Sequence, residues 1–228
     1  MSIRHSALAL IPYLLLALIA PAGGHAQGVE GSDYRKLVAP QPTASPGKIE
    51  VIEFFSYGCP HCAHFAPLID AWSAKLPADV VFRRVPVGFN RDAWINLQRA
   101  YYALQATGDL ARLDGALFHA IHDEHKQLFE GQNLADWVGR NGGDAEKFSA
   151  AYVSFGVNNQ TVQADRMAQN FAIDSVPSLE VNGQYVALAN PERGETGYLN
   201  QLLANTDALI ARVRAESAPQ PAAKHRAK

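Results

Sequence analysis

The chain alternates between short apolar stretches and longer segments in which apolar residues recur at helical spacing. Residues 49–55 form an almost continuous apolar run, which is typical of a strand buried on both faces. The next segment, 59–76, has helical spacing, and Pro67 within it predicts a kink. Residues 80–87 predict a second strand. A strand, a helix and a strand in this order predict two parallel neighbours in one sheet.

Helical spacing then dominates from residue 90 to residue 171. The predicted helices are 91–107, 110–129, 134–140, 144–155 and 160–171. The glycines expected to end them are Gly108, Gly131, Gly142, Gly143 and Gly156. Because this stretch is too long for a loop within a compact domain, we interpret it as an inserted helical domain.

Strand patterns return after the helical stretch. Residues 178–181 and 184–187 flank Asn182 and Gly183, and Asn-Gly between two such runs is the strongest short-range signal for a hairpin. A last helix is predicted from residue 196 to residue 214. The fold class is therefore α/β, with a strand-helix-strand half and a strand-hairpin-helix half separated by the helical insertion.

These patterns divide the chain into consecutive parts. The expected divisions are a signal peptide at 1–26, an irregular lead-in at 27–47, a first α/β half at 48–89, the helical insertion at 90–171, a second half at 172–216 and a disordered tail at 217–228. The lead-in is polar and is expected to hold one edge strand near residues 37–39. The tail is rich in Ala, Pro and Lys, a composition that does not bury a core.

The N-terminal segment has the three regions of a secretory signal. Arg4 precedes an apolar run, small residues follow, and cleavage is expected after Ala26. The apolar run is too short, and too soon followed by Pro21, to favour a transmembrane span. The mature chain is therefore expected to be exported and soluble.

Composition and charge are those of an ordinary globular protein. The 228 residues are 48% hydrophobic and 18% charged, with a formal net charge of −2, so nucleic acid is not an expected partner. The chain holds only two cysteines. In an oxidising compartment a further cysteine would tend to pair, so the fold itself is expected to use no other intrachain disulfide.

Both cysteines lie in Cys59-Pro60-His61-Cys62, where the predicted strand turns into the predicted helix. Pro60 suits the first turn, where its missing N–H would have no partner in any case. The helix dipole, the first-turn N–H groups and the His61 imidazole all favour a thiolate at Cys59, and cysteines placed in this way have pKa values of roughly 3.5 to 7.5. A stabilised thiolate makes the disulfide a stronger oxidant, so we predict that this chain donates disulfides.

Glu53 is the one charged residue between positions 51 and 55, and an unpaired carboxylate in a buried strand would be costly. One interpretation is a proton carrier for Cys62; the other is a structural carboxylate paired with a cation. No flavin-binding or nucleotide-binding motif is present, so no cofactor is expected and reoxidation must come from outside the chain.

Other functions are compatible with parts of the motif. A structural disulfide is disfavoured because a two-residue loop stabilises little. Cys59, Cys62, His61 and His64 are close in sequence and would suit a metal-binding chaperone, but a helix start does not aim both imidazoles at the sulfurs, so we expect no metal site. The histidines at positions 119, 122 and 125 are expected on one polar helix face. A reductase, an isomerase and a redox-independent holdase stay open.

Residues 53–62 resemble the active site of the DsbA family of periplasmic thiol:disulfide oxidoreductases. The helical stretch resembles that family's insertion, and residues 175–178 with the Asn-Gly turn resemble its cis-proline loop and following hairpin. The resemblance covers nearly the whole chain except the lead-in and the tail. It implies a thioredoxin fold with an inserted all-helical domain.

The resemblance also implies roles for particular residues. Cys59 would be the exposed reactive cysteine, Cys62 its buried partner, and Pro60-His61 the dipeptide that tunes them. Val176-Pro177 would be a cis peptide whose backbone binds an extended substrate. The implied partners are reduced exported proteins and a DsbB-like membrane quinone reductase. Isomerase relatives carry a dimerisation domain for which the lead-in is too short, so a periplasmic monomer is expected.

Overall fold

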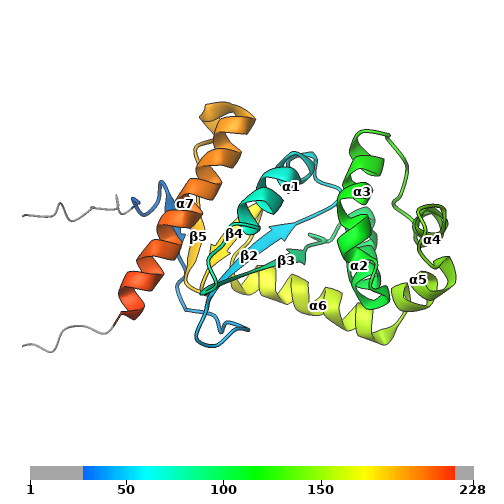
Figure 1. The fold of residues 1–228 in the computed structure, drawn as a ribbon, viewed down its shortest axis with the longest axis horizontal. Helices are drawn as coiled ribbons and strands as arrows, with labels where there is room; N and C mark the ends of the chain where they lie inside the picture. The colour runs from blue at the N-terminus through cyan, green and yellow to red at the C-terminus, as the bar shows by residue number, and fades with distance from the viewer. Residues whose placement is uncertain (1–27, 219–228) are drawn as a thin grey trace, which may run out of the picture.

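The computed structural model describes residues 28–218, which form one mixed sheet with helices on both faces and at one end (Figure 1). The sheet order is β1-β5-β4-β2-β3. Its strands are β1 (Tyr34–Lys36), β2 (Ile49–Phe55), β3 (Val80–Pro86), β4 (Ser178–Val181) and β5 (Tyr185–Ala187). Strands β2 and β3 are parallel, as predicted, and every other neighbouring pair is antiparallel. The predicted signal peptide lies outside the described residues, as does the tail beyond Ala218.

The helices surround the sheet on three sides (Figure 1). They are α1 (Pro60–Ser73), α2 (Asp92–Thr107), α3 (Leu110–His122), α4 (Gly131–Arg140), α5 (Ala145–Tyr152), α6 (Phe155–Asn170), the 3-10 turn η1 (Pro191–Arg193) and α7 (Gly194–Ser217). Helices α1 and α7 pack on one face of the sheet and α6 on the other, while α2 to α5 gather at one end. No helix within residues 28–218 is long and apolar enough to cross a membrane.

Strand β2 is buried at every position, which explains its almost continuous apolar sequence. Val51 packs in the core beneath α1 and α7, whereas Ile52 and Phe54 pack against α6. The hairpin prediction is confirmed as well: Asn182 and Gly183 both have positive φ, at 58° and 68°, as a tight two-residue hairpin turn requires. Strand β2 therefore has a hydrophobic core on each of its faces.

The expected edge strand near residues 37–39 was wrong in position. The strand is β1, which pairs with β5 through Tyr34, Arg35 and Lys36. The Leu37 N–H still bonds the Gln184 carbonyl, but Val38 is fully exposed and has turned away from the sheet. Three paired residues are enough to cover the edge of β5, and the polar lead-in carried no clear period to show which three.

Two helix boundaries in the insertion were also wrong. The predicted helix 110–129 ends at His122, because His125 adopts a left-handed φ of 53° and takes the chain out of the helix. The helix expected to begin at residue 160 begins at Phe155, where the Ser154 hydroxyl accepts the Val157 N–H.

Two of the glycines expected to end helices instead lie inside them. Gly131 is the first residue of α4, and Gly156 is the second residue of α6. A glycine near a helix start and a glycine just past a helix end look alike in a single sequence. Gly108 does end a helix, with the left-handed φ of 80° that such a position favours.

Two further helices have boundaries that differ from the expected ones. Helix α1 is shorter than the predicted 59–76, and it continues through Pro67. Helix α7 extends through Ser217, which had been assigned to the tail. The last insertion helix, α6, packs Ala164 and Ala168 onto the sheet beside Phe54, so it contributes to the core of the α/β half.

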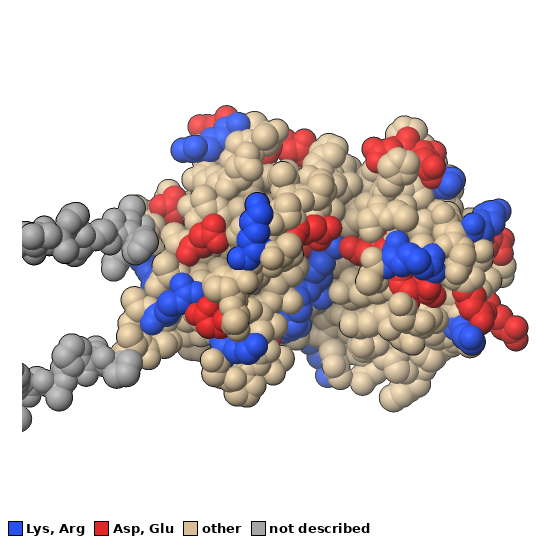
Figure 2. Space-filling view, in the orientation of Figure 1, with Lys and Arg blue, Asp and Glu red and all other residues tan. Residues whose placement is uncertain are grey.

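Charged residues of both signs are interspersed over the face seen in Figure 2. This distribution agrees with the small net charge of −2. It shows no large field of one sign on that face that would attract a polyelectrolyte.

Candidate active site

A tight turn after β2 brings the first cysteine to the start of α1. The Cys59 N–H bonds the Ser56 carbonyl at 3.1 Å, and the Gly58 N–H bonds the Ser56 hydroxyl at 3.2 Å. A side chain at position 58 would place its Cβ only 2.5 Å from Nε1 of Trp94, so this position requires glycine. Cys59 is consequently the N-cap residue of α1, with Pro60 as the first helical residue.

Both cysteines are free thiols in this structure, and their environments differ. The expectation that Cys59 is exposed was wrong: its side chain is buried, with 5% exposed, because the Val176-Pro177 loop faces it, and Cys62 is completely buried one turn into the helix. A hydrogen bond from the Cys62 thiol, assisted by the N–H groups of Cys62 and His61 and by the His61 ring, outweighs partial burial and lowers the pKa of Cys59 to about 6. Burial, followed by the neighbouring Cys59 sulfur, raises the pKa of Cys62 well above its ordinary value. The pair therefore holds one acidic and one inert sulfur.

The loop before β4 faces the acidic cysteine. Val176-Pro177 is a cis peptide, and the Cys59 thiol donates a hydrogen bond to the Val176 carbonyl at 3.5 Å. A groove of about 490 Å³ begins at this loop and runs between the active-site helix and the start of α7. Its lining includes His61, Val176, Pro177 and Tyr198. The structure thus brings together residues that are far apart in the sequence.

One carboxylate on α7 contacts both histidines of the active-site helix. Oε1 of Glu195 lies 2.8 Å from Nδ1 of His64 and 3.8 Å from Nε2 of His61. The His61 side chain is exposed to solvent at the edge of the groove. Its imidazole is also close enough to the Cys59 sulfur for its charge to lower the Cys59 pKa. The sequence did not indicate Glu195, because the contact depends on how α7 packs beside α1.

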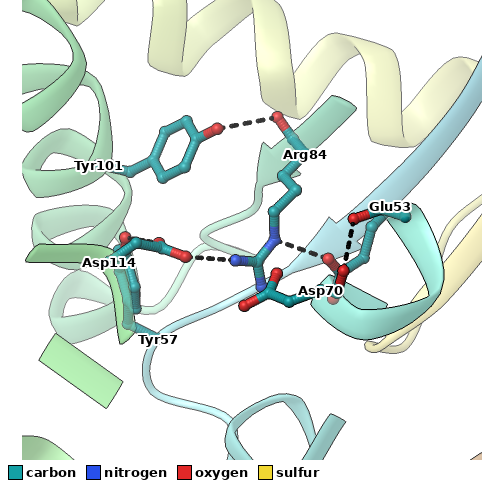
Figure 3. A network of polar contacts seen from close by, with 7 residues as sticks. Glu53, Tyr57, Asp70, Arg84, Tyr101 and Asp114 are labelled. Atoms are coloured by element: carbon teal, nitrogen blue, oxygen red, sulfur yellow. Dashed lines mark hydrogen bonds and ion pairs between the residues drawn. The ribbon is translucent and has the colours of Figure 1, made fainter. Parts of the chain in front are cut away.

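Glu53 is fully buried, and Arg84 on the neighbouring strand pairs with it. Nε of Arg84 lies 2.7 Å from Oε2 of Glu53, while Nη1 of Arg84 bonds Asp114 on α3. Figure 3 shows Arg84 between these two carboxylates, with Asp70 also close by. Burial raises the pKa of Glu53 against the opposing effect of Arg84, and the charge of Glu53 contributes to the raised pKa of Cys62.

The contacts of Glu53 are compatible with both sequence interpretations. Its Oε2 atom has the cationic partner expected of a structural carboxylate, whereas Oε1 has no hydrogen-bond partner among the described residues. The sequence analysis did not identify three members of this network, which are Arg84, Asp114 and Tyr57. The Tyr57 hydroxyl donates a hydrogen bond to Asp114. The pair Arg83-Arg84 in the middle of an apolar strand was a signal for Arg84, since a cation there needs a buried anion.

The three histidines expected on one helix face do not share a face. His119 and His122 lie on α3, and His125 lies in the loop that follows. Within residues 28–218, no group of three or more His, Cys, Asp or Glu side chains is arranged to hold a metal ion. His122 instead lies 2.7 Å from the Tyr57 carbonyl, next to the active-site turn.

An acidic cysteine at a helix start, a buried second cysteine and a facing cis-proline loop on a thioredoxin-like sheet define a dithiol-disulfide oxidoreductase. Comparisons with known proteins agree. Residues 50–193 match the family model of the DSBA-like thioredoxin domain. The thiol:disulfide interchange protein DsbA of Burkholderia cepacia is 40% identical over 77% of this chain and 85% of its own length. The Pseudomonas aeruginosa protein of the same name is 38% identical over 90% and 97%.

Solved structures show the same fold. The crystal structure of Pseudomonas aeruginosa DsbA superposes with a TM-score of 0.75 at 38% identity, covering 82% of this chain and 95% of that one. The DsbA structure from Xylella fastidiosa gives 0.76 at 32% identity, covering 83% and 99%. This chain belongs to the DsbA family, and its fold is the thioredoxin fold of that family.

Proposed function

We propose that this chain is a periplasmic oxidase of protein thiols, which donates a Cys59–Cys62 disulfide to newly exported proteins during oxidative folding. The observation that carries the proposal is the acidity of Cys59, whose pKa is lowered to about 6 by the Cys62 thiol and the first-turn N–H groups. Stabilising the thiolate stabilises the reduced protein, which makes the disulfide a stronger oxidant and Cys59 a better leaving group.

In the proposed reaction, a client thiolate attacks Sγ of Cys59 in the disulfide form. The Cys59–Cys62 bond breaks as the mixed disulfide forms, and Cys62 leaves with the electron pair and takes up a proton. A second client thiolate then attacks the client sulfur and expels Cys59 as a thiolate. The client loses two electrons and gains a disulfide, while the protein gains two electrons and ends as the dithiol.

Glu53 is proposed to carry the proton that Cys62 needs on leaving. Burial raises the pKa of Glu53 against the effect of Arg84, so it takes up a proton more readily than an ordinary carboxylate, and its charge raises the pKa of Cys62. Pro60 and His61 are proposed to tune Cys59, Pro60 by starting the helix and His61 by adding positive charge beside the sulfur.

Clients are proposed to bind beside the loop of Val176 and Pro177. The Val176 carbonyl lies at hydrogen-bond distance from the reactive sulfur, so a client strand paired with this backbone would place its cysteine next to Cys59. The groove of about 490 Å³ provides space for a neighbouring client side chain. Backbone pairing of this kind is tolerant of sequence, which suits an enzyme with many unfolded substrates.

Reoxidation is proposed to come from a DsbB-like membrane quinone reductase, because each turnover leaves the dithiol and the chain carries no redox cofactor motif. The proposed location follows from the same chemistry, since a donated disulfide persists only in an oxidising compartment.

The test measures both redox states of the mature chain. We expect the reduced form to unfold at a higher temperature than the disulfide form at about pH 7, because a Cys59 thiolate with a pKa near 6 contributes about 1.4 kcal/mol there. This contribution grows as the pH rises toward the ordinary thiol pKa of about 8.5 and disappears as the pH falls through about 6. Thiolate absorbance of the reduced form across pH reports the titration of Cys59, because the raised pKa of Cys62 makes Cys59 titrate first. A disulfide form that unfolds at the higher temperature, with Cys59 titrating near its ordinary value, would instead favour a reductase.

A further inference from the structure

Helix α3 of the insertion contacts the residue that begins the active-site turn at three points. Asp114, Phe118 and His122 are spaced four residues apart on one side of the helix, and each contacts Tyr57. Asp114 accepts the Tyr57 hydroxyl, the Phe118 ring packs at 4.7 Å between centroids, and Nε2 of His122 lies 2.7 Å from the Tyr57 carbonyl oxygen. Figure 3 shows Tyr57 beside Asp114 at this junction.

The contact from His122 is directed at the backbone, unlike the other two. A carbonyl oxygen only accepts hydrogen bonds, so Nε2 of His122 carries the hydrogen. The imidazole is also stacked on the Phe118 ring, with planes 29° apart, which fixes its orientation. Tyr57 is 1% exposed, so its main chain and its ring are both held by α3.

The Tyr57 carbonyl belongs to the peptide that leads into Gly58 and Cys59. The stabilising hydrogen bonds to the Cys59 sulfur come from the Cys62 thiol and from N–H groups in the first turn of α1. These bonds form only if the turn holds Cys59 over the helix start. Within the described residues, the turn has one internal backbone bond and one bond to the Ser56 hydroxyl. Two of its side chains bond to other elements, the Tyr57 hydroxyl to Asp114 and the Cys59 thiol to the Val176 carbonyl, whereas His122 bonds to the backbone carbonyl of Tyr57.

We propose that His122 is a positioning residue for thiol–disulfide exchange: its Nε2–H holds the Tyr57 carbonyl and thereby fixes the active-site turn so that Cys59 stays over the start of α1. Through this bond the helical insertion sets the reactivity of a cysteine that lies in the other half of the fold. This inference rests on the proposed function only in that Cys59 is the exchanging sulfur.

His119 provides a matched control on the same helix. Its side chain is 62% exposed, and its only ionic contacts within residues 28–218 are to Asp123 and Glu124, each at 3.9 Å. A substitution at position 119 therefore removes an imidazole from α3 without touching the active-site turn.

The experiment compares His122→Phe, His122→Gln and His119→Phe with the parent, all with both cysteines present, by thiolate titration of the reduced form and by equilibration with glutathione. Phenylalanine keeps a ring on Phe118 but has no donor, whereas glutamine keeps an N–H donor. For His122→Phe we expect the Cys59 pKa to rise by roughly half a unit to one unit and the equilibrium constant for oxidising glutathione to fall about three- to fivefold. Both quantities should stay within about twofold of the parent in His119→Phe and return toward it in His122→Gln.

The results separate this inference from the proposed function. Suppose that Cys59 is acidic in the parent and that folded His122→Phe keeps the parent's Cys59 pKa and equilibrium constant. This result would overturn the role of His122 and leave the oxidase intact, as would equal changes in both phenylalanine variants. A Cys59 that titrates near its ordinary value in the parent would overturn the oxidase instead. If His122→Phe does not fold, His122→Leu replaces it as the variant without a donor: a raised Cys59 pKa supports the positioning bond, and a pKa equal to that of the parent refutes it.

Discussion

Glu180→Gln should make the protein more stable, and the gain should grow with pH. Glu180 lies on β4, completely buried. Its Oε1 atom accepts the Gln184 N–H at 3.0 Å, while Oε2 has no partner among the described residues. Burial, reinforced by the charge of Glu50 and opposed by the N–H groups of Gly183 and Gln184, raises the pKa of Glu180 to about 8. The folded protein therefore keeps a proton that the unfolded chain gives up.

The magnitude follows from the two pKa values. An unfolded glutamate titrates near 4.3, so between about pH 5 and pH 8 each pH unit costs the folded state about 1.4 kcal/mol, or roughly 4 kcal/mol in all. Movement of water and side chains toward a buried carboxylate would reduce this figure to about 2 kcal/mol. Glutamine keeps the acceptor for Gln184 and does not titrate. The stability difference between variant and parent should accordingly widen by about 2 to 4 kcal/mol over this range.

The assay is urea unfolding of the reduced parent, Glu180→Gln and a surface control, Glu192→Gln, at about pH 5, 6.5 and 8. Glu192 is exposed in the turn before α7, and its side chain makes no hydrogen bond to the part of the chain that the structure describes. The difference in unfolding free energy between variant and parent removes the contribution of the titrating groups that the two proteins share. If the two curves stay parallel with pH, or if Glu192→Gln behaves like Glu180→Gln, then Glu180 does not hold the proton and the reasoning from burial is refuted.

Three further substitutions, one of them with a matched control, test the site and the fold. Glu53→Gln should slow the attack of a client thiolate on the disulfide, in which Cys62 is the leaving group, at least tenfold in stopped-flow measurements. An unchanged rate with lower stability would make Glu53 a structural partner only. Gly183→Ala should cost more than about 2 kcal/mol in urea unfolding, because φ is +68° and the new Cβ would lie 2.0 Å from the Gln41 carbonyl oxygen. Gly47→Ala, with φ +77° and open space, should cost clearly less, and equal costs would contradict the clash. Ser154→Ala should cost about 1 kcal/mol by removing the cap of α6; an unchanged urea midpoint would exclude the cap.

The sequence predicted features that depend on neighbouring residues. Strand β2, the Asn-Gly hairpin and the helix start at Cys59 follow from runs of a few residues with a clear period or turn signal. The likeness to the DsbA family rested on the same kind of short motif. Where the local signal was weak, as in the polar lead-in before β1 and around Gly131 and Gly156, the predicted boundaries were wrong.

The arrangement of the site was decided by the tertiary structure. Glu53 could be identified as a buried carboxylate, but its partner Arg84 lies on another strand and the third member, Asp114, on a helix of the insertion. His122 holds a carbonyl 65 positions earlier in the chain, and no periodicity links the two. The sequence by itself determined which sulfur would be acidic, because the helix start that favours the thiolate is local. Only the packing of α3 and β3 decided which groups contact Glu53 and Tyr57, because such contacts depend on the positions of whole elements in space.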